Sequence, residues 1–202
     1  MEHSLVDDIL KGFDSTKSAA KSALPPVHLW NPDFCGDIDM RIARDGTWYY
    51  LGTPIGRKRL ARLFSTVLRH DDDGRYYLVT PAEKIGITVD DAPFVAVGLS
   101  VEGEGETQTL RFTTNMGDAV EAGLDNPIRV TINGESGEPS PYVLVRARLE
   151  ALIGRSVFYD LVALGCGAVV EGQSYFGVWS GGMFFPFMGT DELHTLSDTE
   201  CS

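Results

Sequence analysis

Seven basic side chains gather between residues 41 and 69, and a single acid, Asp45, accompanies them. This segment is therefore +6 within a chain of net charge −12. Four of the seven fall where a helix is expected to begin, namely Arg57, Lys58, Arg59 and Arg62. Cations at a helix start oppose the helix macrodipole, whereas free N–H groups and guanidinium groups both bind phosphate. The pattern predicts an anion site, with ion pairs to some of the 29 acids as the alternative.

The triplet Ile-Gly-Arg occurs at residues 55–57 and again at residues 153–155, each time before a helical pattern. An aromatic ring beside an arginine is able to hold a base while the guanidinium holds a phosphate. We therefore expect a ligand site in a cleft between two units. Its predicted residues are Arg57, Lys84, Arg146, Arg155, Trp48, Tyr142 and Trp179.

Catalytic signatures are missing from the sequence. No Walker lysine follows the glycine at residue 52 with the required spacing, and neither G-x-S-x-G nor H-E-x-x-H occurs. The three cysteines show no zinc spacing. Asp37 and Asp39 would share one face of a strand, which leaves a hydrolase or transferase as a third reading. We predict no catalytic residue, metal or cofactor.

Turn residues at regular intervals indicate a chain rich in β-strands. An amphipathic helix is expected at 4–13 and a linker at 15–26. Asp45-Gly46 predicts a hairpin between 40–42 and 48–51. Apolar spacing predicts a helix over 57–69, and strands are then expected at 76–80, 85–89, 93–101, 107–114, 128–132 and 141–149.

The last part of the chain repeats the order of the first. A helix is expected within 155–164, followed by strands at 175–180 and 183–187 and an acidic tail. Both Ile-Gly-Arg triplets thus lie between a hairpin, a helix and another hairpin, which predicts a duplication. Two α+β units, each an antiparallel sheet carrying a helix, follow from this pattern.

Composition narrows the classes of function. With 43% hydrophobic residues in 202, the chain is able to bury a core. Its acidity argues against nucleic acid as a partner. The N-terminus lacks the basic and apolar regions of a signal peptide, and no apolar run reaches the length of a membrane span. We expect a cytoplasmic protein.

The stretches CGDIDMRIARDGTWYYLGTPIGR and LFSTVLRHDDDGRYYLVTPAEKIGITVDDAPF resemble a bacterial family known as domain of unknown function 1285. The similarity resumes at LRFTTNMGD, YVLVRARLEALIGRSVFYDLV and GVWSGGMFFPF, and it covers about 27–189. The resemblance implies a duplicated α+β architecture with a pleckstrin-homology-like C-terminal half. It also implies a nucleotide-like ligand between the domains and a role in signal transduction, with no assigned reaction.

These observations define the predicted organisation and function. The domains are an arm at 1–26, an N-terminal unit at 27–91, a C-terminal unit at 92–189 and a tail at 190–202. The first hypothesis is a non-enzymatic protein that binds a phosphorylated or nucleotide-like small molecule. The alternative is a protein-interaction module whose basic segment meets an acidic partner or the acidic tail.

Overall fold

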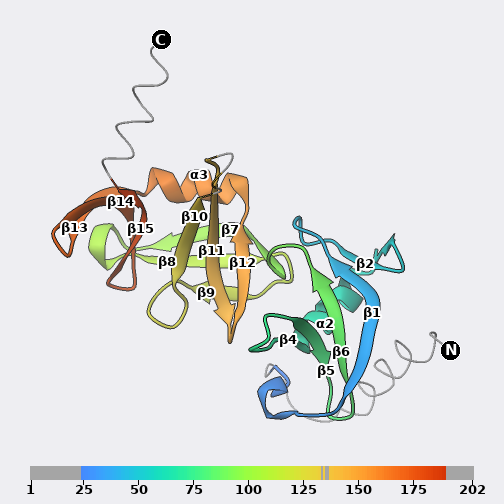
Figure 1. The fold of residues 1–202 in the computed structure, drawn as a ribbon. Helices are drawn as coiled ribbons and strands as arrows, with labels where there is room; N and C mark the ends of the chain where they lie inside the picture. The colour runs from blue at the N-terminus through green and yellow to red at the C-terminus, as the bar shows by residue number, and fades with distance from the viewer. Residues whose placement is uncertain (1–23, 133, 135–136, 190–202) are drawn as a thin grey trace. The chain divides into compact units, whose positions relative to one another are not determined.

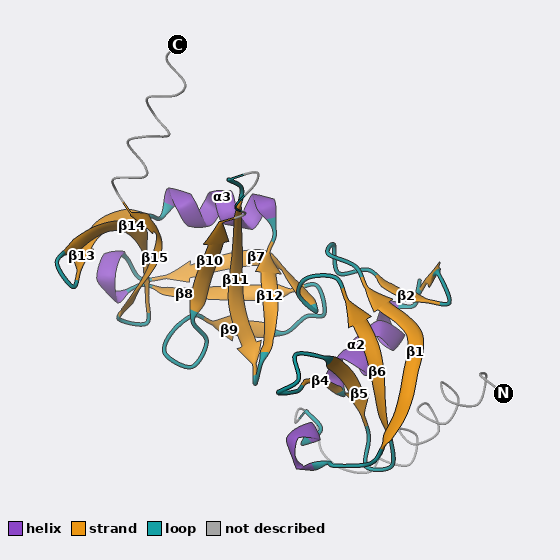
Figure 2. Cartoon of the chain, in the orientation of Figure 1, coloured by secondary structure: helices purple, strands orange, loops and turns teal. Residues whose placement is uncertain are grey.

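The computed structural model describes residues 24–132, 134 and 137–189, and these residues are mostly β-strand (Figures 1 and 2). The predicted helix at 4–13, most of the linker and the acidic tail lie outside the described residues. Contacts divide the chain into two compact units. The first unit contains residues up to Asp39 together with Gly56–Thr88, and the second contains Met40–Ile55 together with residues from Val89 onward.

A six-stranded sheet is built from the first half of the chain. In spatial order its strands are β3 (Thr53–Pro54), β2 (Trp48–Tyr50), β1 (Phe34–Ile42), β6 (Lys84–Val89), β5 (Tyr76–Val79) and β4 (Leu68–His70). The Asp45-Gly46 hairpin is confirmed, because β1 and β2 pair antiparallel and Gly46 has a φ of 81°. The backbone N–H of Thr47 donates to Asp45, and this hydrogen bond closes the turn and lowers the pKa of the carboxyl group.

Helix α2 (Lys58–Thr66) packs on one face of this sheet through Ala61 and Phe64 (Figure 1). The predicted helix over 57–69 is therefore too long at its C-terminal end. Val67 ends the helix, and Leu68 already belongs to β4, which pairs with β5. Val67 and Leu68 are both buried. Their positions in the sequence fit a helical pattern, although Leu68 reaches the core from strand β4.

A second six-stranded sheet belongs to the C-terminal half. Its order is β10 (Ile128–Ile132), β11 (Pro139–Arg146), β12 (Leu149–Ile153), β7 (Phe94–Glu102), β8 (Thr109–Thr114) and β9 (Ala119–Glu121). The 3-10 turns η1 (Val27–Leu29) and η2 (Gly105–Thr107) precede β1 and β8, respectively. Strand β12 pairs with β7 in parallel, whereas the prediction had only antiparallel sheets.

The strand predicted over 141–149 is wrong, because the chain turns back within it. Ala147 adopts a φ of 46°, and the residues on either side form the antiparallel pair β11 and β12. Periodicity alone misses this turn, since a polar Arg-Ala-Arg stretch carries no glycine, proline or asparagine to mark it.

Helix α3 (Arg155–Ala163) begins directly after β12 and contacts β7 (Figure 2). Gly154 is its N-cap, and the backbone N–H of Gly154 donates to the carbonyl oxygen of Ala96 at 2.9 Å. A Cβ at Gly154 would lie 3.0 Å from that oxygen, so the close approach of β7 favours glycine here. No helix in the described part of the chain is long and apolar enough to cross a membrane.

A three-stranded antiparallel sheet completes the second unit, in the order β13 (Cys166–Val170), β14 (Gln173–Ser180) and β15 (Met183–Gly189). Buried Ser180 ties it to the second sheet. Its hydroxyl donates to the carbonyl of Ala122 and accepts from the N–H of Leu110, at 2.7 and 2.9 Å.

The order of elements repeats, as the sequence predicted, but the pairing does not. Three strands, a helix and three strands run from β1 to β6, and the same order runs from β10 to β15. In the first run the two strand triplets share one sheet through β1 and β6, whereas in the second they belong to different sheets. Two sheet-rich halves are thus confirmed, and the repeat concerns the order of the elements.

Candidate functional site

Four basic side chains lie exposed over the first turns of α2: Arg57, Lys58, Arg59 and Arg62, here called the α2 basic surface. Arg57 is the N-cap, and the first turn contains no acidic residue. Among the described residues, none of the four forms an ion pair. The cations therefore face the positive end of the helix dipole without a compensating carboxylate from this part of the chain.

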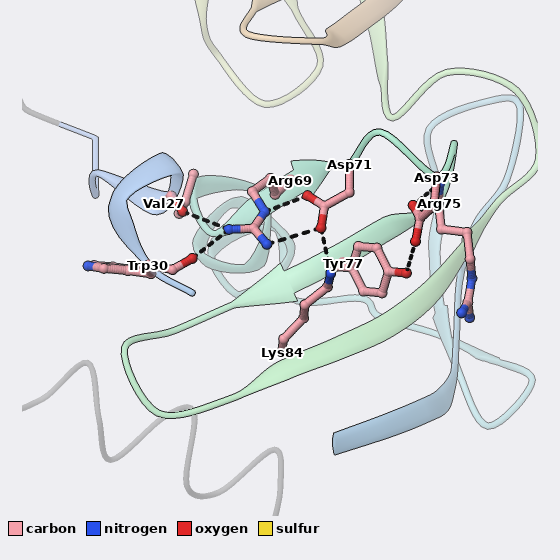
Figure 3. A network of polar contacts seen from close by, with 8 residues as sticks. All are labelled: Val27, Trp30, Arg69, Asp71, Asp73, Arg75, Tyr77 and Lys84. Atoms are coloured by element: carbon pink, nitrogen blue, oxygen red, sulfur yellow. Dashed lines mark hydrogen bonds and ion pairs between the residues drawn. The ribbon is translucent and has the colours of Figure 1, made fainter. Parts of the chain in front are cut away.

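A polar network of the first unit surrounds Arg69, the middle residue of β4 (Figure 3). The guanidinium of Arg69 donates to both oxygens of Asp71 at 2.6 and 3.0 Å. It also donates to the backbone carbonyls of Val27 and Trp30 at 3.1 and 2.6 Å. Arg69 thus fastens the segment that precedes β1 to β4, an edge strand of the same sheet.

Lys84 extends this network from the start of β6. Its ammonium lies 2.5 Å from Asp71 Oδ2 and 3.9 Å from the ring centre of Tyr77. Burial alone would raise the pKa of Asp71, but hydrogen bonds from Arg69 and Lys84 outweigh it and hold that pKa below its usual range. The Tyr77 hydroxyl donates to Asp73 at 2.6 Å, and this bond, followed by burial, raises the pKa of Tyr77.

Arg75 reaches across the sheet to Asp37 on β1 at 2.5 Å and lies over the rings of Phe34 and Tyr77. This pair passes above Gly86 of β6, where a Cβ would overlap the Asp37 carboxylate. Asp37, proposed above as a member of a catalytic pair, is thus held by a guanidinium and is 60% exposed. The described residues contain no group of histidine, cysteine and carboxylate side chains arranged for a metal.

The predicted ligand residues are distributed over both units. Arg57 and Lys84 belong to the first unit, and the other five belong to the second. Lys84 is engaged with Asp71, and Arg146 is paired with Asp118 at 3.2 Å while lying over the ring of Phe94. The cleft predicted between the units stays a prediction.

Three further predicted residues have defined surroundings in the second unit. The Tyr142 hydroxyl donates to Asp91 at 2.8 Å, and burial, followed by this bond, raises the pKa of Tyr142. Trp48 is 2% exposed and belongs to the core, so its ring presents little surface to a ligand. Trp179 packs against Phe184 with ring centres 5.4 Å apart.

Arg155, the first residue of α3, is exposed and donates to the hydroxyl of Tyr159 at 3.2 Å. This hydrogen bond is the main cause of its raised pKa. Arg57 and Arg155 therefore occupy similar places at the starts of α2 and α3, although the triplets differ by one position in helix register. Arg57 is an N-cap, whereas Arg155 follows the N-cap Gly154.

Sequence reasoning missed Asp71 and Arg69 as partners. Asp71 lies in the polar stretch HDDDG, yet its side chain is mostly shielded by two cations. The signal was the i, i+2 spacing of Arg69 and Asp71 at a strand end. Lys84 is 13 residues further along, and only the β5–β6 hairpin brings it to the same carboxylate.

Fold and contacts together define a mostly β chain of two sheet-rich units. Its N-terminal part matches the family model described as "Domain of unknown function (DUF1285), N-terminal domain" over residues 25–92. Residues 93–187 match the model described as "Protein of unknown function (DUF1285), C-terminal domain". The chain belongs to the DUF1285 family.

Two solved structures of the same family resemble this chain. A DUF1285 family protein from Silicibacter pomeroyi DSS-3 is 55% identical, with a TM-score of 0.79, and the match covers 91% of this chain and 97% of that one. A DUF1285 family protein from Shewanella baltica OS155 is 27% identical, with a TM-score of 0.48, over 61% of this chain and 90% of that one. No curated protein matches the sequence.

Proposed function

We propose that this protein is a non-enzymatic binding protein for a phosphorylated small molecule, held at the α2 basic surface. The observation that supports the proposal is the set of four exposed cations at the start of α2, without an acid in the first turn. A phosphate offsets the repulsion between these cations and the helix dipole, and it accepts hydrogen bonds from guanidinium and backbone N–H groups.

Thermal unfolding in the presence of phosphorylated ligands tests the proposal. A panel of nucleotides and phosphorylated metabolites at about 1 mM is expected to contain a member that raises the Tm, since a ligand at about ten times its Kd stabilises by about 1.4 kcal/mol. The triple variant Arg57→Gln, Arg59→Gln, Arg62→Gln should lose this shift. Arg148→Gln, an exposed arginine on the turn between β11 and β12, is the matched control and should keep it. A panel without any stabilising member contradicts the proposal.

An acidic protein segment is the second candidate occupant of the same surface. The four cations extend over residues 57–62, which is more than one phosphate group needs. An acidic partner would bind more weakly as salt rises and would be indifferent to nucleotides at low concentration. Competition between a nucleotide and an acidic peptide, measured at two salt concentrations, separates the two occupants.

For the second unit we propose a pleckstrin-homology-like fold, supported by a helix that directly follows β12 and contacts β7. A cytoplasmic, signal-transducing role is consistent with a surface that responds to phosphorylated compounds. Fractionation of the bacterial cell, with the native protein followed by antibody, tests the location.

A further inference from the structure

The three-stranded sheet of the second unit is free of charge. None of the residues of β13, β14 and β15 is an aspartate, glutamate, lysine or arginine, although 23% of the chain is charged. The sheet has two edges. Strand β15 contains Pro186, which lacks an N–H, and it lies against β10. Strand β13 is the other edge.

Strand β13 has none of the devices that usually protect an edge strand. Its sequence is CGAVV, without charge or proline, and all five residues pair with β14 in an uninterrupted register. Within the described residues β13 pairs with β14 alone, so its outer backbone groups face away from the sheet. Val169 is 71% exposed and Val170 is 38% exposed. Edges of this kind are templates for another strand.

We infer that β13 is a dimerisation edge, at which two copies of this chain join their three-stranded sheets into one six-stranded sheet. The inference is separate from the proposed function, because it rests on residues of another sheet. The lack of charge at this edge suits a second copy of an acidic chain. Two chains of −12 repel each other over most of their surfaces, and the uncharged sheet is a place where they are able to meet without like charges in contact.

Self-pairing of β13 is geometrically consistent. An antiparallel pair about a two-fold axis brings the same patch of both copies together. Centred on Ala168, this register pairs all five residues: Ala168 meets its counterpart, Gly167 meets Val169, and Cys166 meets Val170. The β-branched residues then face small ones across the new ladder, and no like charges are opposed.

Disulfide trapping tests both the interface and the register. In a background of Cys35→Ser, Cys166→Ser and Cys201→Ser, the added substitution Ala168→Cys should give a covalent dimer under mild oxidation, since directly opposed Cβ atoms approach disulfide distance. The control is Val97→Cys in the same background, a 57% exposed position on β7. It should stay uncrosslinked.

Sedimentation of the full chain gives the second readout. Wild type is expected to dimerise, and Val169→Lys should raise the dimer Kd about tenfold or more, because edge lysines oppose strand pairing. Leu124→Lys, at a 79% exposed loop residue, should leave the dimer Kd unchanged. Circular dichroism confirms that both variants fold. A wild type that stays monomeric at about 100 μM, or a dimer that is indifferent to Val169→Lys and does not trap at Ala168→Cys, overturns the inference.

Discussion

Arg69 joins a carboxylate and two backbone carbonyls that are distant in the sequence, and its side chain is only 16% exposed. Without Arg69, Asp71 keeps only Lys84 as an ion-pair partner within the described residues, and the carbonyls of Val27 and Trp30 lose a donor. We therefore expect Arg69→Gln to lower the free energy of unfolding by about 2 to 3 kcal/mol, somewhat less than for a fully buried pair. Urea denaturation followed by circular dichroism measures the change.

Arg59→Gln is the control for the Arg69 variant, because Arg59 is exposed and forms no ion pair within the described residues. It should change the free energy of unfolding by less than about 0.5 kcal/mol. Equal losses in both variants would show that the Arg69 contacts add nothing beyond the general charge of the surface.

Asp71 makes the same network sensitive to acid. Its pKa is lowered in the folded chain, so its contribution to stability is complete above the unfolded pKa of about 3.9 and is lost as pH falls through the lower folded value. The gap in unfolding free energy between wild type and Asp71→Asn should thus narrow as pH falls below about 4. Ser180→Ala, which removes a buried hydroxyl without a titrating group, should show a gap that is constant with pH. A constant gap for Asp71→Asn as well would contradict this reading.

At the scale of elements, the two Ile-Gly-Arg triplets make different demands on glycine. A Cβ at Gly154 would press on the backbone oxygen of Ala96, which cannot rotate away. A Cβ at Gly56 would meet nothing within 4 Å, and Gly56 is not among the glycines with positive φ. Gly154→Ala should therefore destabilise by about 1 to 2 kcal/mol, and Gly56→Ala should be neutral or stabilise by up to about 1 kcal/mol. Thermal unfolding of the two variants compares them directly, and equal effects would contradict the difference.

The observed strands and turns also show which parts of the fold periodicity and turn residues predict. Gly-containing hairpins and long apolar strands were predicted well, because turn residues mark both ends of each strand. The short strands β4, β9 and β13 were missed, since three to five residues give too little periodicity. The β11–β12 turn at Ala147 was missed for want of turn residues. Parallel pairing of β12 with β7 depends on residues more than 50 positions apart and leaves no local signal.

The candidate site could likewise be predicted only in part. The cluster of cations at the start of α2 is local, and the sequence alone shows it. Which cations form ion pairs cannot be seen in the local sequence alone. Arg69, Lys84 and Arg146 pair with carboxylates in the folded chain. Trp48 was predicted to stack on a ligand, but a tryptophan in a strand is also a natural core residue, and here it is buried.

At the scale of the whole molecule, charge separates the two surfaces proposed above. The α2 basic surface attracts anions, and this attraction weakens as salt shortens the Debye length to about 8 Å at physiological ionic strength. The edge of β13 is uncharged, and its association is opposed by the repulsion between two chains of −12. Salt should therefore act on the two surfaces in opposite directions.

Raising NaCl from about 20 to about 300 mM is expected to strengthen the dimer several-fold, because it screens repulsion without touching the strand pairing. The same change should weaken binding of an anionic ligand to the α2 basic surface. Sedimentation velocity measures the first effect, and titration calorimetry with the best phosphorylated ligand measures the second. Val169→Lys should abolish the salt-promoted dimer and leave ligand binding intact. A dimer that instead dissociates as salt rises would be held by ion pairs, and its interface would have to be sought at the α2 basic surface against the acids of another copy.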